Sequence, residues 1–325
     1  MQEVKQKAIE LLQSGKVQRV LGWKTGEFFY DLTPAVFETV EEIKKDFVFS
    51  PFCGANLSKY LIAESRKEGK IAAFLKPCDS YSFVQLLKEH RIVRENVHVV
   101  GVQCNGMCDI EAIKAQGVKG VTAVRQEGET LVCETLYGEK SVPYAAALSE
   151  RCKTCKSKKI VLFDELLGEN GEDDPDCGRF DLVSKLEAMT AEERFAFWQQ
   201  ELSRCIRCNA CRNVCPACSC EKCVFDNDTL GTANKAAANS FEEQNFHIIR
   251  AFHVAGRCTD CGECSRVCPQ HIPLHLLNRK FIKDTNELYG EYQAGADLET
   301  RPPLVDFTQD DCEPSVVYTR GGNGK

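Results

Sequence analysis

Two runs of cysteines share one spacing, C-x2-C-x2-C-x3-C, and a proline follows each run. They are Cys205, Cys208, Cys211 and Cys215, and then Cys258, Cys261, Cys264 and Cys268. Three thiolates at two-residue intervals can wrap a loop around one face of a 4Fe-4S cluster, while the fourth, at the start of the next helix, points towards a neighbouring cluster. The runs therefore predict two 4Fe-4S clusters with crossed ligands.

The crossed arrangement assigns the ligands as in bacterial two-cluster ferredoxins, where each cluster takes the last cysteine of the other run. The ligands of cluster 1 are then Cys205, Cys208, Cys211 and Cys268, and those of cluster 2 are Cys258, Cys261, Cys264 and Cys215. The alternative is a pair of structural zinc sites, but zinc ligands come as two C-x2-C pairs separated by a longer loop. Paired clusters with crossed ligands favour electron transfer.

Three more cysteines, Cys218, Cys220 and Cys223, lie between the runs, where a simple ferredoxin has none. They can be ligands of a further cluster that takes one outside ligand. Alternatively, they pack near the first cluster and tune it through S–H and backbone hydrogen bonds. The helical pattern that follows contains His247 and His253, which we interpret as core or helix-surface histidines. The alternative is that one of them is a proton-coupled ligand of a cluster.

Two close pairs of cysteines, Cys104 with Cys108 and Cys152 with Cys155, lie in the first half of the chain. Two separated pairs can bind a third 4Fe-4S cluster or one zinc ion. Basic residues surround the second pair and would favour thiolates and offset the negative charge of a cluster. The remaining cysteines, Cys133, Cys177 and Cys312, have no partner at a diagnostic spacing, and we interpret them as ordinary small apolar residues or spare thiols.

The elements that must position these cysteines follow from the apolar pattern. Short apolar segments at 47–52, 71–77 and 97–103 alternate with helical patterns at 56–68, 80–87 and 109–115, which predicts a largely parallel sheet covered by helices. Residues 121–144 alternate around a Glu-Gly-Glu turn and predict an antiparallel hairpin. Residues 1–14 have the pattern of an amphipathic helix, and Thr190 with Glu193 forms a capping box for another.

Cys53, Cys78 and Cys104 each follow one of the apolar segments, which predicts that they lie at the carboxyl edge of the sheet. Open α/β sheets bind ligands at this edge, and helices that begin there point their N-termini at it, as phosphate binding requires. A phosphate-bearing cofactor such as a flavin nucleotide fits this pattern, although the chain has no G-x-G-x-x-G or P-loop motif. The alternative is that Cys53 and Cys78 are buried apolar residues at strand ends.

Composition bounds the class of protein. The chain has 325 residues and 20 cysteines, and it opens without the apolar segment of a signal peptide. We therefore expect a reducing, cytoplasmic compartment, in which closely spaced cysteines bind metal. The net charge of -7 gives no basic footprint for nucleic acid, and no apolar run approaches the ~18 residues of a membrane span.

These patterns predict an α/β N-terminal domain, mostly a parallel sheet with helices, and a C-terminal ferredoxin-like domain of helices and loops with two 4Fe-4S clusters. The expected boundaries are 1–165 for the α/β domain and 166–195 for an acidic linker and helix. The dicluster domain would span 196–285, and a polar, proline-containing segment at 286–325 is expected to be an extended tail.

Residues 74–109, 151–157 and 203–223 carry a resemblance to the beta-subunit family of the deazaflavin (coenzyme F-420)-reducing hydrogenases and formate dehydrogenases. The resemblance implies FAD in the α/β domain, 4Fe-4S clusters, and electron transfer between a catalytic subunit and a soluble two-electron carrier. It also implies that the Cys104/Cys108 and Cys152/Cys155 pairs form a flavin-proximal cluster site. The residues it implies around the flavin are Pro51, Cys53, Gly54, Asn56, Lys59, Lys76, Pro77 and Cys78.

The chain departs from the usual family order, because its ferredoxin runs follow the flavin-type domain. This resembles the variant found beside formate dehydrogenase, hydrogenase or heterodisulfide-reductase-like subunits in anaerobes. The first hypothesis is an electron-transfer subunit of such a complex. The alternative is a flavin-dependent enzyme that itself reduces a deazaflavin or a nicotinamide, and a third possibility is an assembly subunit with structural metal only.

Overall fold

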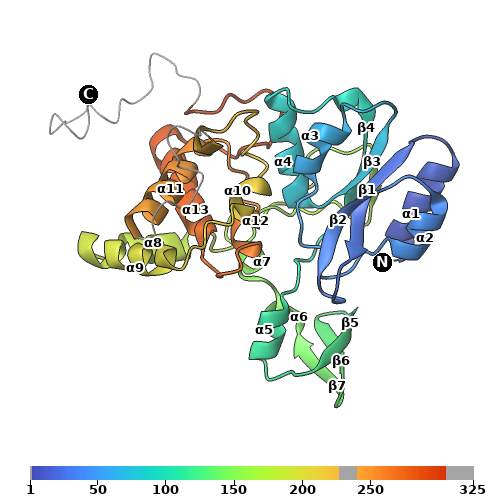
Figure 1. Ribbon diagram of the computed structural model, residues 1–325, viewed down its shortest axis with the longest axis horizontal. Helices are drawn as coiled ribbons and strands as arrows, with labels where there is room; N and C mark the ends of the chain where they lie inside the picture. The colour runs from blue at the N-terminus through green and yellow to red at the C-terminus, as the bar shows by residue number, and fades with distance from the viewer. Residues whose placement is uncertain (1, 227–239, 305–325) are drawn as a thin grey trace.

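A computed structural model describes residues 2–226 and 240–304. Its N-terminal part is an α/β domain around a sheet with strand order β2-β1-β3-β4-β8 (Figure 1). β1 pairs in parallel with β3, β3 with β4 and β4 with β8, whereas β2 is antiparallel to β1. The strands are β1 (Arg19–Thr25), β2 (Leu32–Phe37), β3 (Ile71–Leu75), β4 (Val97–Val102) and β8 (Glu165–Leu167). The predicted parallel sheet is confirmed.

Two details of the predicted sheet were wrong. The apolar segment 47–52 is not a strand: only Phe47 forms an isolated bridge, and the rest is a loop packed into the core. The strand beside β3 is instead β1, which is buried except at its last two residues, Lys24 and Thr25. β8 extends past residue 165, so the start of the predicted linker belongs to the sheet.

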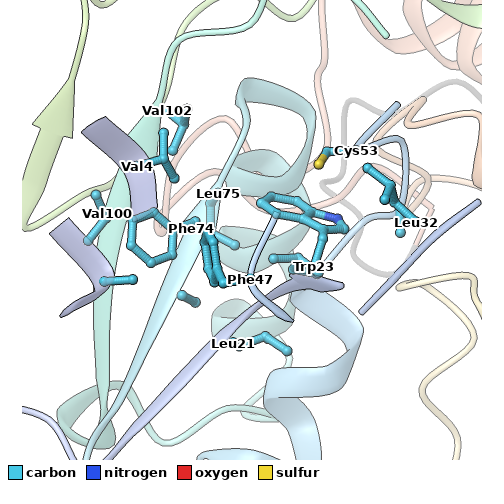
Figure 2. Close-up of a cluster of buried hydrophobic side chains, with 14 of the residues drawn as sticks. Val4, Leu21, Trp23, Leu32, Phe47, Cys53, Phe74, Leu75, Val100 and Val102 are labelled. Carbon is cyan, nitrogen blue, oxygen red and sulfur yellow. The ribbon is translucent and has the colours of Figure 1, made fainter. Parts of the chain in front are cut away.

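Helices cover the sheet and close the core. The sequence predicted α1 (Gln2–Gln13), and α4 (Pro77–Lys88) begins where the chain leaves β3, with Pro77 at its first position. Figure 2 shows the aromatic centre of the core, where Phe47 lies between the side chains of Phe74 and Trp23. The remaining short elements are α2 (Val40–Asp46), η1 (Ser58–Tyr60), α3 (Leu61–Glu64) and η2 (Arg94–Asn96).

A small antiparallel lobe projects from the α/β domain (Figure 1). It contains β5 (Val121–Glu127), β6 (Thr130–Thr135) and β7 (Gly138–Pro143), in the order β5-β6-β7, beside α5 (Ile110–Ala115) and α6 (Tyr144–Ala147). The predicted hairpin is therefore confirmed and extended by a third strand. The chain returns from this lobe through α7 (Glu150–Lys153), which carries Cys152.

The C-terminal part consists of helices joined by cysteine-rich loops, as predicted. Thr190 and Glu193 form the expected capping box of α9. α9 packs against α11, and α11 packs against α13 (Figure 1). The elements are α8 (Asp181–Glu187), α9 (Ala191–Ser203), α10 (Ala210–Asn213), η3 (Val224–Asp226), α11 (Ser240–His253), α12 (Glu263–Arg266) and α13 (Leu274–Tyr289).

The segment after α13 returns to the α/β domain. Helix α13 runs past the predicted boundary at 285 and ends at Tyr289. Beyond it Gly295 has φ +76°, and a Cβ atom there would lie 1.9 Å from the carbonyl oxygen of Tyr81 on α4. Glycine is required at this close approach, so the chain packs against α4 at Gly295, and further on the carbonyl oxygen of Thr300 accepts a hydrogen bond from Lys88 of the same helix. This part of the predicted tail is therefore not an extended arm. Cys312 lies outside the described residues. None of the described helices is long and apolar enough to span a bilayer.

Candidate functional site

The two cysteine runs fold in the same way. Each run has a left-handed residue two positions after its first cysteine, Arg207 (φ 53°) and Asp260 (φ 61°). Each run has a second left-handed residue four positions after its first cysteine, Asn209 (φ 60°) in one and Gly262 (φ 68°) in the other. This residue is the N-cap of a one-turn helix, α10 or α12. Left-handed residues are uncommon outside glycine, so their repetition marks a loop with a specific shape. The duplication in sequence is thus a duplication in structure.

The four thiols predicted for cluster 1 line one narrow cavity. They are Cys205, Cys208, Cys211 and Cys268, with Phe246 and His247 of α11 on the same wall. The backbone N–H of Arg207 lies 3.3 Å from the sulfur of Cys205 and donates to it. The structure therefore brings together three thiols from the first run and one from the second, in the crossed arrangement that the spacing predicted.

The four thiols predicted for cluster 2 also lie near one another. Burial raises the pKa of Cys258, Cys261 and Cys264, and the sulfur of Cys215 raises each of them further. Cys215 differs, because the S–H of Cys218 donates to its sulfur and lowers its pKa to about 6. Cys218 therefore acts on the crossing cysteine of the first run, and it does so as a hydrogen-bond donor.

A third group of thiols lies at the carboxyl edge of the sheet. Cys78 follows β3, Cys104 follows β4, and both line a cavity with Cys152 and Cys155. Burial raises the pKa of Cys104 to about 11 and that of Cys155 to about 12, so these thiols need a bound cation to become thiolates. Cys261 of the dicluster domain lies on the wall of the same cavity.

Cys108 is not part of this third group. Gly106 adopts φ +98°, and after this turn Cys108 is buried in the core, where Tyr144 hydrogen-bonds to its sulfur. The hydroxyl of Tyr144 also donates to the carbonyl oxygen of Gly106, 2.8 Å away. Cys78, which had been expected beside the flavin, lines the cavity with Cys104, Cys152 and Cys155, whereas Cys108 does not.

The residues expected around a flavin do not enclose one open cavity. Cys53 is fully buried in the hydrophobic core, beside Trp23 and Leu32 (Figure 2), where burial raises its pKa to about 12. The segment that follows lies under the dicluster domain, since Gly54 accepts a hydrogen bond from Arg151 and the Asn56 N–H donates to Glu263. Pro51 is buried there as well.

The lysines in that set are also held internally. Lys76 is completely buried, with its Nζ 2.8 Å from Asp79 and 2.9 Å from the carbonyl oxygen of Ala55. Lys59 donates instead to the carbonyl oxygens of Arg212 and Cys218 across the domain boundary. Lys76, Pro77 and Cys78 line the third thiol cavity, and Lys59 lines a different one. These four residues are therefore divided between two cavities.

The second of these cavities, of about 600 Å³, lies between the two domains. Its lining combines apolar and aromatic side chains such as Tyr60 and Phe225 with cationic ones such as Lys59 and Arg91. Cys218, Cys220 and Cys223 lie on its wall, as does His253. A volume of this size is in the range of cofactor and small-ligand sites.

The buried face of α11 carries His247, which the sequence analysis named, and two charged groups that it did not, Glu243 and Arg250. Nε2 of His247 lies 3.2 Å from the sulfur of Cys205, and Glu243 shares this site. Burial lowers the pKa of His247 to about 3, so the imidazole is neutral at pH 7. One turn further, Arg250 is 1% exposed, and its three guanidinium nitrogens have no hydrogen-bond acceptor among the described residues.

The guanidinium of Arg250, which has no acceptor among the described residues, indicates whether iron–sulfur clusters fit the dicluster domain. The groups that act on its charge are the thiols of Cys264, Cys211, Cys215 and Cys218. A buried cation without acceptors is strongly unfavourable in an empty protein. Two clusters in the adjacent thiol sets would supply sulfur acceptors and compensating negative charge, so the residues fit the group.

Comparison with known proteins agrees with this geometry. Residues 201–272 match the family model of the 4Fe-4S dicluster domain. The chain is 27% identical over 355 aligned positions to the F420-dependent formate dehydrogenase subunit beta of Methanocaldococcus jannaschii, covering 91% of this chain and 92% of that one. It is 26% identical to the F420-dependent formate dehydrogenase 1 subunit beta of Methanococcus maripaludis, covering 90% of each. The resemblance to the beta-subunit family is confirmed.

Among solved structures, the F420-reducing [NiFe] hydrogenase complex from Methanosarcina barkeri contains a chain with 14% identity and a TM-score of 0.40, matched over 61% of this chain and 85% of that one. The matches to the formate dehydrogenase beta subunits extend over nearly the whole of both chains, and so include the α/β domain as well as the dicluster domain.

Proposed function

We propose that this beta-type chain is the electron-transfer subunit of an anaerobic oxidoreductase complex. The observation that carries the proposal is the succession of three thiol sets. The first and second sets exchange their last cysteines, and Cys261 of the second set lies on the wall of the third cavity. Clusters held by these sets would pass single electrons along one line. The named relatives are subunits of F420-dependent formate dehydrogenases, so the partners we propose are a catalytic subunit and a two-electron carrier.

For each cluster we propose a separate ligand set. Clusters 1 and 2 take the crossed sets, which the duplicated loops present. For the third we propose Cys78, Cys104, Cys152 and Cys155, because these four line one cavity and Cys108 does not. Arg151 and Lys158 lie on the same cavity, and their positive charge offsets that of four thiolates and a cluster.

A flavin nucleotide is a further part of the proposal. Most of the residues expected around it lie in the core, under the dicluster domain or on the thiol cavity, whereas Lys59 lines the cavity of about 600 Å³. The support for a flavin therefore comes from this larger cavity. Its aromatic and cationic lining suits a planar ring with phosphate groups. The same cavity supports the alternative function, a flavin-dependent enzyme that reduces a deazaflavin or a nicotinamide by itself, because it is open to solvent and large enough for a cofactor.

The experiment is anaerobic purification with iron, sulfide, zinc and flavin measured on one sample, followed by reduction with dithionite. The proposal expects about twelve irons and twelve sulfides per chain, as three 4Fe-4S clusters require, and electron paramagnetic resonance signals on reduction. About eight irons would remove the third cluster from the proposal. Zinc in place of iron would overturn the electron-transfer function altogether. Reduction of a deazaflavin by the isolated chain, with no partner present, would favour the alternative.

A further inference from the structure

Arg250 lies in the interior of the dicluster domain, in the last turn of α11. The whole residue is 1% exposed, and Nε, Nη1 and Nη2 are closed off from solvent without an acceptor in residues 2–226 and 240–304. The other buried arginines of this domain are paired: Arg207 with Glu243, and Arg279 with Asp260. Among the described residues, Arg250 is therefore a buried charge without a hydrogen-bond acceptor.

The position of Arg250 relates it to both thiol sets of this domain. Residues on either side of it pack against thiols of both sets: Phe246 lies in one buried cluster with Cys211 of set 1 and Cys264 of set 2. Val254 lies in another buried cluster with Cys215, and Cys258 packs against it. α11 brings it there because positions 243, 247, 250 and 254 form one face of a helix, and this face is buried. One cation thus faces two metal-binding sets.

The large cavity also has Arg250 on its wall, so an anion in that cavity is the competing partner. However, the guanidinium nitrogens themselves are closed off, so a ligand in the cavity does not reach them in this structure. The other arginines on the wall already have carboxylate partners, as Arg212 has Asp226 and Arg257 has Glu89. The thiol sets are therefore better candidates than an anion in the cavity for the partner of Arg250.

We propose that Arg250 is a positioning residue shared by clusters 1 and 2, whose guanidinium donates hydrogen bonds to sulfur atoms of both and raises both reduction potentials. Reduction adds negative charge to a cluster, and a buried cation with N–H donors stabilises the reduced form. One residue therefore keeps the two potentials together, which suits electron transfer between neighbours. The inference rests on the proposed presence of both clusters.

The test is a redox titration of the iron-loaded full chain, followed by electron paramagnetic resonance. R250M and R250Q remove the charge, and R250K keeps it with fewer donors. We expect unchanged iron and sulfide content, a shift of both midpoint potentials to lower values in R250M and R250Q, and a smaller shift in R250K. The control is R125Q, which removes one arginine charge from the exposed strand β5 outside the dicluster domain, and its potentials should equal those of the wild type.

Each other outcome has a defined meaning. Wild-type potentials in R250M and R250Q would overturn the inference. Loss of inorganic pyrophosphate binding in the same variants would also overturn it, because the partner of the guanidinium would then be an anion in the cavity. Loss of iron in the neutral variants with retention in R250K would support the need for the charge. Loss of iron in all three would make Arg250 a folding residue and overturn the inference. Absence of iron from the wild type would instead count against the proposed function.

Discussion

Arg151 of α7 and Glu263 of α12 form a buried ion pair across the domain boundary, with Nη1 2.7 Å from Oε1. Arg151 also donates to the carbonyl oxygens of Cys261 and Gly54, 2.7 and 2.6 Å away. Gly262 makes this approach possible, because a Cβ atom there would lie 2.7 Å from the side chain of Arg151. The third thiol set and the second are thus held together by one side chain.

Replacing Arg151 by Gln should therefore weaken the docking of the two domains. The variant loses the Arg151 charge and its hydrogen bonds, but Glu263 keeps Arg266 as a second partner. The expected loss is therefore smaller than the roughly 3 to 5 kcal/mol of a buried charge left without any partner. The two tryptophans of the chain report the two parts separately, Trp23 in the sheet and Trp198 on α9. Anaerobic urea unfolding followed by their fluorescence should show two separated transitions in R151Q and one in the wild type. R125Q, which breaks an exposed ion pair on β5, is the control and should leave the unfolding curve unchanged.

The ligand set of the third cavity predicts a contrast between two cysteines. Cys78→Ser should lose about four of the twelve irons, because one of four ligands is gone. Cys108→Ser should keep all of them, since its sulfur lies beside Tyr144 and outside the cavity. Iron and sulfide analysis of both variants decides the point. Loss of iron in C108S but not in C78S would restore the set that the sequence predicted.

Thiol alkylation distinguishes cluster ligands from spare cysteines. Cys208 and Cys220 are both exposed, but only Cys208 belongs to a proposed cluster. With iodoacetamide at pH 8 the iron-loaded chain should be modified at Cys220 and protected at Cys208, and removal of iron by a chelator should make Cys208 reactive. Protection of Cys220 until iron is removed would identify it as a ligand.

Cys53 gives the pH dependence of the same experiment. Burial raises its pKa to about 12, so its thiol stays protonated and unreactive as the pH rises through the ordinary cysteine value near 8.5. Peptide mapping by mass spectrometry between pH 7 and pH 10 should find Cys53 unmodified throughout in the folded chain. Modification at pH 9 would mean that the residue is accessible, as a flavin-lining position would be.

The buried pair of Lys76 and Asp79 predicts a non-additive result. Lys76→Met should destabilise the α/β domain by about 3 to 5 kcal/mol, because Asp79 remains buried and charged. The double variant K76M/D79N should lose less than the sum of the single variants. Urea unfolding in a W198F background isolates the signal of Trp23, whose ring lies 4.5 Å from the Lys76 Nζ. Additive losses would mean that the two charges do not interact.

The regular parts of this fold could be predicted because their signals are local. The capping box at Thr190, the helical pattern of α1 and the alternation in β5 and β6 each lie within one short window. β1 was missed because it depends on a distant residue: a Cβ atom on Gly22 would lie 2.3 Å from the ring of Phe47. The apolar segment after Phe47 looked like a strand, although its role is to fill the core above that glycine.

The metal-binding residues divide in the same way. The spacing within each run specifies a loop, so the crossed sets could be predicted and are brought together in the structure. Cys78 has no cysteine at a diagnostic distance, and only the parallel order of β3 and β4 places it beside Cys104. Arg250 could not be found at all from sequence, because what distinguishes it is that its buried guanidinium has no hydrogen-bond acceptor in the part of the chain that the structure describes.

Cys261 and Asp260 form part of the wall of the third cavity. Their position affects the order in which clusters can be inserted during biosynthesis. All four proposed ligands of that cavity leave the ribosome within the first 155 residues, about a hundred residues before the loop that covers them. We expect that iron enters while this side is still open, and that the later domain then closes the site against oxygen. The chain would thus receive its cofactors in the order in which its segments are made.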